Sequence, residues 1–214
     1  MSDLPGDVSS GALLLIDIQN SFADPAHLEW APPEGRAAVA AAVRNVGSLV
    51  DATRNAGLKV MWVRLIQDPE HPWPASLWLR GIDLEQWPST AEPCVAGTSG
   101  ADFYALHPDP GETIVTKSRY SAFFGTSLDS VLTELGVEWL LVAGLTTECC
   151  IQTTIFDAVQ LGYKVLLVED AAAAYESAVH DGAVTALTMH AAGKITTATA
   201  VRELTVHADV GTPQ

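Results

Sequence analysis

Three residues with reactive side chains each follow a short apolar run of the kind that forms a buried strand. Asp17, Lys117 and Cys150 stand near the ends of such runs. The carboxyl ends of parallel strands meet at one edge of a sheet, so we expect the three groups to converge there. Alone, each has an ordinary interpretation as a turn aspartate, a solvated lysine or a small buried cysteine. Their joint position is what predicts a site.

The chemistry of these groups favours nucleophilic attack by sulfur. A cysteine in the first turn of a helix faces unpaired N–H groups and the positive end of the helix dipole, and a nearby lysine adds to their effect. We therefore expect a lowered pKa for Cys150. A carboxylate can take the thiol proton and return it to a leaving amine, while backbone N–H groups hold the oxyanion. We interpret the three groups as the site of an enzyme that hydrolyses a C–N bond in a small molecule.

Two adjacent cysteines compete for the role of nucleophile. On a helical wheel, Cys149 points away from the buried stripe that begins at Ile151, whereas Cys150 lies on the flank of that stripe, nearer the strand ends. The wheel favours Cys150.

The rest of the chain supplies the elements that position these groups. Apolar runs of strand length alternate with longer runs whose apolar residues recur at helical spacing. We predict strands over residues 12–18, 58–65, 113–116, 139–144, 164–169 and 194–197, and helices over 34–56, 126–136, 147–161 and 176–192. This order predicts an α/β fold with three layers, in which a doubly wound, six-stranded, mainly parallel sheet carries helices on both faces.

The domain organisation predicted from the sequence is a single domain over residues 1–214. No internal repeat and no long linker divides the chain. The segment 67–100 departs from the regular alternation because it is rich in proline and tryptophan. It is either a lid that covers the substrate or an interface loop that contacts another subunit.

Composition excludes several partners and compartments. The formal net charge of −15 would repel nucleic acid and anionic membranes, so we expect neither as a partner. No apolar run approaches the roughly 18 residues of a membrane span, and the first residues lack the features of a signal peptide. Cys94, Cys149 and Cys150 fit no disulfide pattern. We therefore expect a cytoplasmic protein with reduced cysteines.

Three motifs resemble those of the isochorismatase-like cysteine hydrolase family. They are LLLIDIQNSF at 13–22, TKSRYSAFFGTSLDSVL at 116–132 and AGLTTECCIQTTIFDAVQLGYKVLLVEDA at 143–171. The resemblance covers nearly the whole chain, with the motifs in matching order. It implies a catalytic triad of Asp17, Lys117 and Cys150, with Ile151 in place of the usual valine. It also implies a cis peptide bond between Leu145 and Thr146.

The resemblance carries further expectations about the site and the assembly. The backbone N–H groups of Thr146 and Cys150 are expected to form the oxyanion hole, and the protein is expected to be a homo-oligomer, either a dimer or a tetramer. Nicotinamidase-type members bind a metal through an Asp-x-His motif, which the spacing of Asp24 and His27 does not match. We therefore predict no metal and no cofactor.

The substrate class is narrowed but not named by these motifs. Cys150 favours hydrolysis of an amide or ureido group, as in the similar N-carbamoylsarcosine, ureidoacrylate and biuret amidohydrolases. The alternatives are an isochorismatase-type enol-ether hydrolase, with the aspartate as general acid, and an inactive binding module of the same fold. Such a module would lack a member of the triad, and none is missing.

Candidates for binding the small-molecule substrate are cationic and aromatic. Arg80 or Arg119 either holds a substrate carboxylate by a bidentate contact or is structural. The aromatic side chains that either line the pocket or belong to the core are Phe22, Trp78, Tyr120, Phe123 and Phe124.

Other enzyme classes with this type of sheet lack their motifs here. The turn DIQNSF after the first strand has no G-x-G-x-x-G, so no dinucleotide phosphate cradle is visible. No G-x-S-x-G of a serine hydrolase occurs. A phosphotransferase using Asp17 would have a second carboxylate two residues on, where Gln19 stands.

Overall fold

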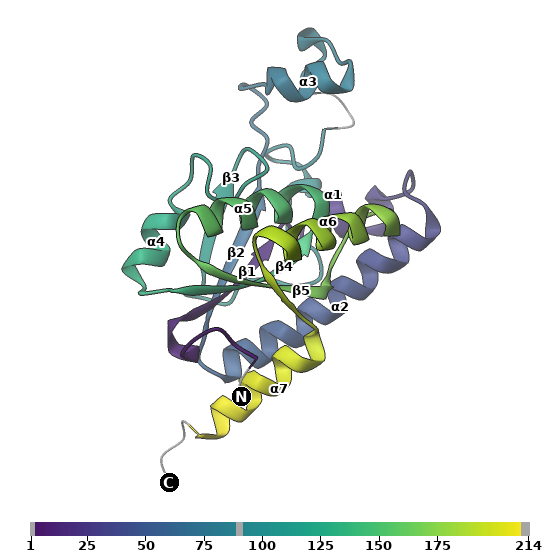
Figure 1. Cartoon of the computed structure of the whole chain (residues 1–214). Helices are drawn as coiled ribbons and strands as arrows, with labels where there is room; N and C mark the ends of the chain where they lie inside the picture. Colours follow the sequence, from purple (N-terminus) through teal and green to yellow (C-terminus); the bar gives the residue numbers. More distant parts are fainter. Residues whose placement is uncertain (1–2, 89–91, 211–214) are drawn as a thin grey trace.

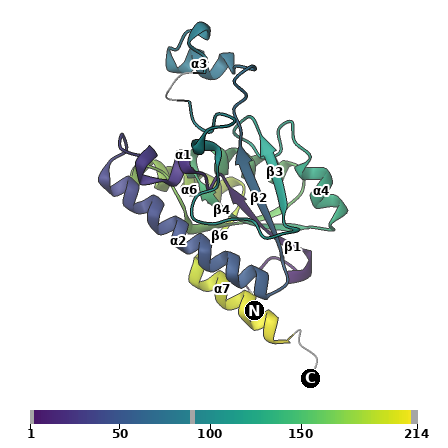
Figure 2. The same ribbon diagram turned by 180° about the vertical axis from the view of Figure 1, so that it is seen from behind.

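The computed structural model describes residues 3–88 and 92–210 and contains a parallel sheet of six strands in the order β3-β2-β1-β4-β5-β6 (Figures 1 and 2). The strands are β1 (Gly11–Ile16), β2 (Lys59–Leu65), β3 (Thr113–Lys117), β4 (Trp139–Leu145), β5 (Lys164–Ala173) and β6 (Gly193–Ile195). The helices are α1 (Asn20–Ala23), α2 (Pro33–Asn55), α3 (Pro74–Arg80), α4 (Leu128–Glu134), α5 (Gln152–Gln160), α6 (Ser177–His190) and α7 (Thr197–Val210). The predicted fold class is confirmed.

The central strands are apolar along their whole length because both faces of the sheet are covered. Every residue of β1 and of β4 is buried. Leu13 and Leu15 point into a core shared with α2 and α7, whereas Leu14 and Ile16 point into a core shared with α4, α5 and α6. The views from the two sides show these helix groups on opposite faces (Figures 1 and 2). The result is a three-layer arrangement.

The strands β2 and β3 are added on one side of β1, and the strands from β4 to β6 are added on the other side. In a doubly wound fold, a binding crevice opens at this reversal, between β1 and β4. β1 pairs with both β2 and β4, and Ile16 lies opposite Gly144. Gly144 has φ 125°, and a Cβ there would come within 2.1 Å of the Ile16 carbonyl oxygen. Only glycine lets the two strand ends approach this closely.

The C-terminal part of the chain differs from the prediction. β6 ends at Ile195, and the helix α7 comes next, where no helix was expected. The threonine and valine residues of this segment lower its intrinsic helix propensity. The helix is held instead by tertiary contacts, because Ala200 and Leu204 are fully buried in the core that α2 shares. Asp170 Oδ1 accepts hydrogen bonds from the backbone N–H and the hydroxyl of Thr197 at 2.7 Å, where α7 begins.

The segment between β2 and β3 carries α3, which stands clear of the three layers (Figure 1). Trp78, Leu79 and Leu84, in and just after this helix, are strongly exposed apolar residues. The expectation that this segment acts as a lid or as a subunit contact stays a prediction, as does the homo-oligomer. Over residues 3–88 and 92–210, no helix is both long enough and apolar enough to cross a membrane.

Candidate active site

Asp17 is the first residue after β1, and its backbone leaves the strand in a left-handed conformation with φ 52°. Its N–H donates to the carbonyl of Val63 at 3.0 Å, so the turn stays attached to β2. The side chain is completely buried. Its Oδ1 atom has no hydrogen-bond partner among the described residues, which leaves that oxygen able to accept a proton.

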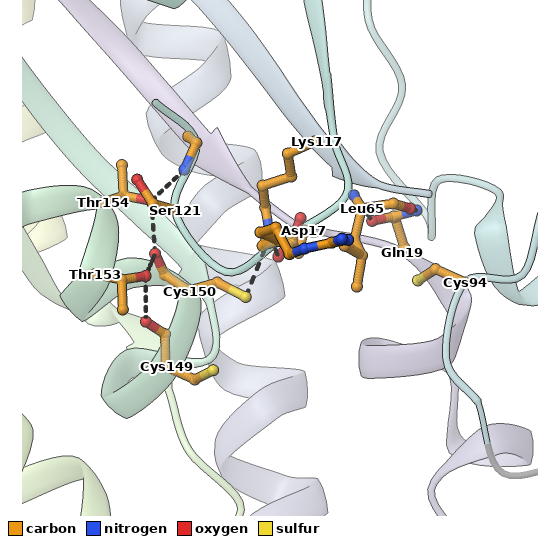
Figure 3. A network of polar contacts seen from close by, with 12 residues as sticks. Asp17, Gln19, Leu65, Cys94, Lys117, Ser121, Cys149, Cys150, Thr153 and Thr154 are labelled. Carbon is orange, nitrogen blue, oxygen red and sulfur yellow. Dashed lines mark hydrogen bonds and ion pairs between the residues drawn. The ribbon is translucent and has the colours of Figure 1, made fainter. Parts of the chain in front are cut away.

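Lys117 ends β3 and joins the other two groups (Figure 3). Its ammonium nitrogen lies 2.8 Å from Asp17 Oδ2 and 3.2 Å from the Cys150 sulfur. It also donates to the carbonyl of Arg119 at 3.0 Å. Only 1% of the residue is exposed, so little water screens these interactions. The three residues predicted from separate strand ends therefore lie in contact.

Cys150 lies in a π-helical turn (Thr147–Ile151) between β4 and α5, not in the regular helix that was predicted. The N–H of Ile151 donates to the carbonyl of Thr146 at 3.1 Å, which is the wider ring of a π-turn. Such turns occur often at functional sites. The turn comes directly after a cis peptide bond between Leu145 and Thr146, as the family resemblance implies.

The Cys150 turn is fixed from outside by hydroxyl groups. Thr154 Oγ1 donates to the Cys150 carbonyl at 2.6 Å and accepts from the N–H of Ala122 at 3.0 Å (Figure 3). Thr147 Oγ1 lies 2.8 Å from His180 Nδ1 on α6. These contacts tie the turn to the segment after β3 and to a neighbouring helix, so the sulfur is held against Lys117.

Gln19 holds the ends of β1 and β2 together. Its amide nitrogen donates to the carbonyls of Leu65 at 2.9 Å and Ala101 at 2.8 Å, and its amide oxygen accepts from the N–H of Leu65 at 2.8 Å. The side chain is fully buried. Because each of these groups is paired with backbone, the amide acts as a rigid bridge beside Asp17.

Burial and charge shift the pKa values of the carboxyl and the ammonium group. Burial raises the pKa of Asp17 above its ordinary value of 3.8, although the charge of Lys117 partly offsets this. For Lys117, burial acts to lower the pKa, but the charges of Asp17 and Cys150 outweigh it, and the pKa is raised. Lys117 therefore stays charged, and Asp17 holds a proton more readily than an exposed aspartate does.

The pKa of Cys150 corrects the sequence prediction, because it is raised well above the ordinary 9.0 and not lowered. The hydrogen bond with Cys149 is the largest cause, followed by burial and by the negative charge of Asp17; Lys117 alone acts in the opposite direction. The pKa of Cys149 is lowered, chiefly by its hydrogen bond with Cys150. One buried ammonium can balance one anion, so a neutral Cys150 thiol beside ionised Asp17 is the favoured resting form.

Removing the neighbouring thiol should therefore make Cys150 more acidic. In Cys149→Ala, the hydrogen bond that raises the pKa of Cys150 is lost, so alkylation of Cys150 by iodoacetamide is expected to begin at a lower pH than in the unaltered protein. Alkylation rates followed by mass spectrometry across a pH series measure this. A midpoint that stays in place or moves upward contradicts the assigned cause.

A small cavity of about 150 Å³ opens at the Cys150 turn, and we call it the Cys150 cavity. Its lining residues are Phe22, Leu65, Gln67, Trp73, Ser76, Arg80, Glu92, Pro93, Tyr120, Thr146, Cys149 and Cys150. Half of them come from the segment between β2 and β3, and among these only Arg80 was predicted individually to contact the substrate. Aromatic rings form much of the wall, since Trp73 and Tyr120 lie edge to face with centroids 4.8 Å apart.

Four of the predicted site residues besides Cys150 line this cavity. They are Phe22, Arg80, Tyr120 and Thr146. The cavity also contains residues that the sequence did not suggest, above all Glu92, Gln67 and Trp73. Their irregular segment has no periodicity from which the direction of a side chain could be predicted.

Four predicted substrate-contact residues lie elsewhere. Trp78 is 82% exposed on α3 and faces a separate hollow, because α3 presents Leu77 and not Trp78 to the buried side. The Arg119 guanidinium lies 4.8 Å from the centroid of Trp73, outside the Cys150 cavity. Phe123 stacks on Tyr163 with centroids 5.9 Å apart and packs against the core. Phe124 is exposed next to Arg119.

Cys94 and Asp24 do not belong to the group formed by Asp17, Lys117 and Cys150. Cys94 is buried, and burial raises its pKa to about 12; all three cysteines are free. Asp24 accepts a hydrogen bond from the N–H of Ala26 at 2.9 Å and caps a short helical turn. In residues 3–88 and 92–210, no three His, Cys, Asp or Glu residues form a group that could hold a metal ion.

Comparison with known proteins gives the class to which this chain belongs. The isochorismatase domain model matches residues 11–200. A ureidoacrylate amidohydrolase of Variovorax paradoxus is 29% identical over 184 residues, covering 76% of this chain and 68% of that protein. A maleamate amidohydrolase of Pseudomonas putida is 29% identical over 170 residues, covering 79% and 75%. A probable inactive nicotinamidase of Arabidopsis thaliana is 33% identical over 178 residues, covering 79% and 83%.

Solved structures share this fold. A cysteine hydrolase from Pseudomonas syringae superposes with a TM-score of 0.84 at 24% identity, covering 97% of this chain and 98% of that one. A pyrazinamidase of Pyrococcus horikoshii, solved in complex with zinc, gives a TM-score of 0.72 at 25% identity, covering 87% and 99%. The chain belongs to the isochorismatase family. The resemblance inferred from the three sequence motifs is confirmed.

Proposed function

We propose that this protein hydrolyses a C–N bond of a small amide or ureido compound, with Cys150 as nucleophile, Asp17 as proton carrier and Lys117 as the balancing cation. The observation that carries the proposal is the position of Lys117 Nζ, 2.8 Å from Asp17 Oδ2 and 3.2 Å from the sulfur at the wall of a cavity. The amidohydrolases among its relatives support the same bond type.

The first half of the proposed reaction forms a thioester. The Cys150 proton moves to Asp17, and because Lys117 balances either anion, this transfer leaves the net charge of the buried group unchanged. The sulfur then bonds to the substrate carbonyl carbon, and the negative charge moves to the carbonyl oxygen. Backbone N–H groups of Thr146 and Cys150 are proposed to hold that oxygen. The C–N bond breaks as nitrogen takes the proton from Asp17 and leaves.

The second half restores the enzyme. A water molecule gives a proton to Asp17, and its oxygen bonds to the thioester carbon. The C–S bond then breaks, and the sulfur recovers its proton from Asp17. One water is consumed, and an acid and an amine or ammonia are released.

The competing proposal is that this protein binds a small molecule without hydrolysing it. One relative is named as a probable inactive nicotinamidase, so we also test this alternative. An ammonia-release screen over small amides, ureido acids and biuret-like compounds separates the two. An enzyme releases ammonia from at least one of them, and Cys150→Ala does not. An enol-ether hydrolase would instead consume isochorismate-type compounds without releasing ammonia.

The proposed proton balance predicts a bell-shaped dependence of kcat/KM on pH. Turnover needs one proton shared between Asp17 and Cys150, so activity falls when both are protonated and when neither is. Burial raises the pKa of Asp17, so the acid limb should lie above 3.8. The pKa of Cys150 is raised by its hydrogen bond with Cys149, by burial and by the charge of Asp17, so the alkaline limb should lie above 9.0. Initial rates over a pH series measure both limbs, and an alkaline limb below 9.0 contradicts this charge balance.

A further inference from the structure

The Cys150 cavity contains an ion pair that the proposed reaction does not use. Arg80, the last residue of α3, pairs through Nη2 with Oε2 of Glu92. The Glu92 side chain is only 2% exposed, whereas that of Arg80 is 31% exposed, and both residues line the cavity. A carboxylate this deeply buried is stable only with a partner, so Arg80 is bound to Glu92 before any substrate arrives.

This pairing changes what the cavity can recognise. Arg80 is the only cationic residue among the described residues that line it, and Lys117, just behind the wall, is already paired with Asp17. Arg119, the other candidate for holding a carboxylate, lies outside. A substrate carboxylate would thus meet no free cation and would compete with Glu92 for Arg80.

The two ion pairs of the site are each balanced without a substrate, and the Glu148 carboxylate, which accepts from Thr146 Oγ1 at 3.0 Å, adds negative charge beside the wall. Asp17 and Lys117 balance each other, as do Glu92 and Arg80, while the cavity wall is largely apolar. An anionic substrate would leave an unbalanced charge in a largely apolar space, which is costly. The formal net charge of −15 on the chain also opposes the approach of anions.

From this arrangement, and resting on the proposed function, we infer that the substrate is an uncharged compound with N–H groups, such as a neutral diamide or ureide, and that Glu92 accepts a hydrogen bond from one of them. Arg80 meanwhile holds Glu92 in place and offers its remaining N–H groups to a carbonyl oxygen of the substrate. The relatives named for ureidoacrylate and maleamate act on carboxylates, so this chain would differ from them in charge preference.

A pair of substrates of matched size tests the inference. Maleamide and maleamate differ only in that a carboxamide replaces a carboxylate. For the unaltered protein, we expect kcat/KM for maleamide to be at least about tenfold higher than kcat/KM for maleamate. This ratio is the effect of one hydrogen bond to a charged group. In Glu92→Gln, Arg80 is released, and the ratio should fall by about tenfold or more. Glu85→Gln, an exposed change on the same segment, removes the same charge and should keep the original ratio.

The outcomes separate this inference from the proposed function. A preference for maleamate, or an unchanged ratio in Glu92→Gln, overturns the inference while leaving the hydrolase intact. If neither compound is hydrolysed, calorimetry measures the dissociation constants of both compounds with Cys150→Ala, and the ratio of the two constants replaces the ratio of kcat/KM. Failure of the neutral compound to bind overturns the inference. Should Glu92→Gln not fold by circular dichroism, Arg80→Gln replaces it. That variant should still prefer maleamide, and a selective loss of maleamate turnover would show that Arg80 binds the carboxylate.

Discussion

Replacing Cys150 with alanine is expected to lower kcat by about 10⁴-fold or more, as removal of a covalent nucleophile does in other hydrolases. The reason is the absence of a second sulfur in the same position. Lys117 Nζ lies 3.2 Å from the Cys150 sulfur, while Cys149 lines the cavity without such a contact to the ammonium group. Ammonia release at saturating substrate measures the loss.

The control for this change is Cys149→Ala, which removes the adjacent thiol. It should retain kcat within about tenfold, since it removes one hydrogen bond and no reacting atom. The folded state of both variants is checked by circular dichroism. Cys150 is 6% exposed in a well-packed turn, so its truncation to alanine should leave the fold intact. Turnover that survives in Cys150→Ala but fails in Cys149→Ala would reassign the nucleophile.

Breaking the buried ion pair is expected to have the second large effect, on stability as well as on turnover. Asp17→Asn leaves the Lys117 ammonium buried without an anion, and Lys117→Met leaves the Asp17 carboxylate without a cation. Both side chains are completely shielded from water, so each change should lower the free energy of unfolding by about 3–5 kcal/mol. Asparagine tolerates the left-handed backbone of residue 17 (φ 52°), so strain should add little.

The double variant separates the ion pair from its surroundings. Removing both charges leaves no uncompensated ion, so the combined loss should be smaller than the sum of the single losses by about 1–3 kcal/mol. Urea unfolding of the four proteins gives these values, and all three variants should be inactive. Strictly additive losses would mean that Asp17 and Lys117 do not stabilise each other in the folded state.

The site combines a nearly neutral buried interior with an acidic surface. Its two ion pairs keep the charge of the cavity balanced, and the proposed proton transfer from sulfur to Asp17 preserves that balance at each step. A thiol with a raised pKa is compatible with such chemistry, because the acceptor is a neighbouring carboxylate whose pKa is also raised. In the proposed reaction, the Cys150 thiol is therefore activated by local proton transfer to Asp17, not by ionisation to solvent.

The sequence by itself determined the architecture and the three residues that meet at the edge of the sheet. Strands buried on both faces must be apolar throughout, so β1 and β4 stand out as continuous runs, and the polar residues directly after them mark the edge of the sheet. Asp17, Lys117 and Cys150 could be found because each lies at the end of a strand or within a few residues after it. Local pattern and position along the chain are enough for such residues.

The tertiary structure decided the features that depend on distant neighbours. The helix α7 forms on a sequence of low helix propensity because α2 buries one of its faces. The raised pKa of Cys150 results in part from burial and from Asp17, which lies far away in the sequence. The pairing of Arg80 with Glu92, like the outward position of Trp78, arises in an irregular segment without periodicity. Charge balance and the direction of side chains in such a segment come from packing, which no local pattern encodes.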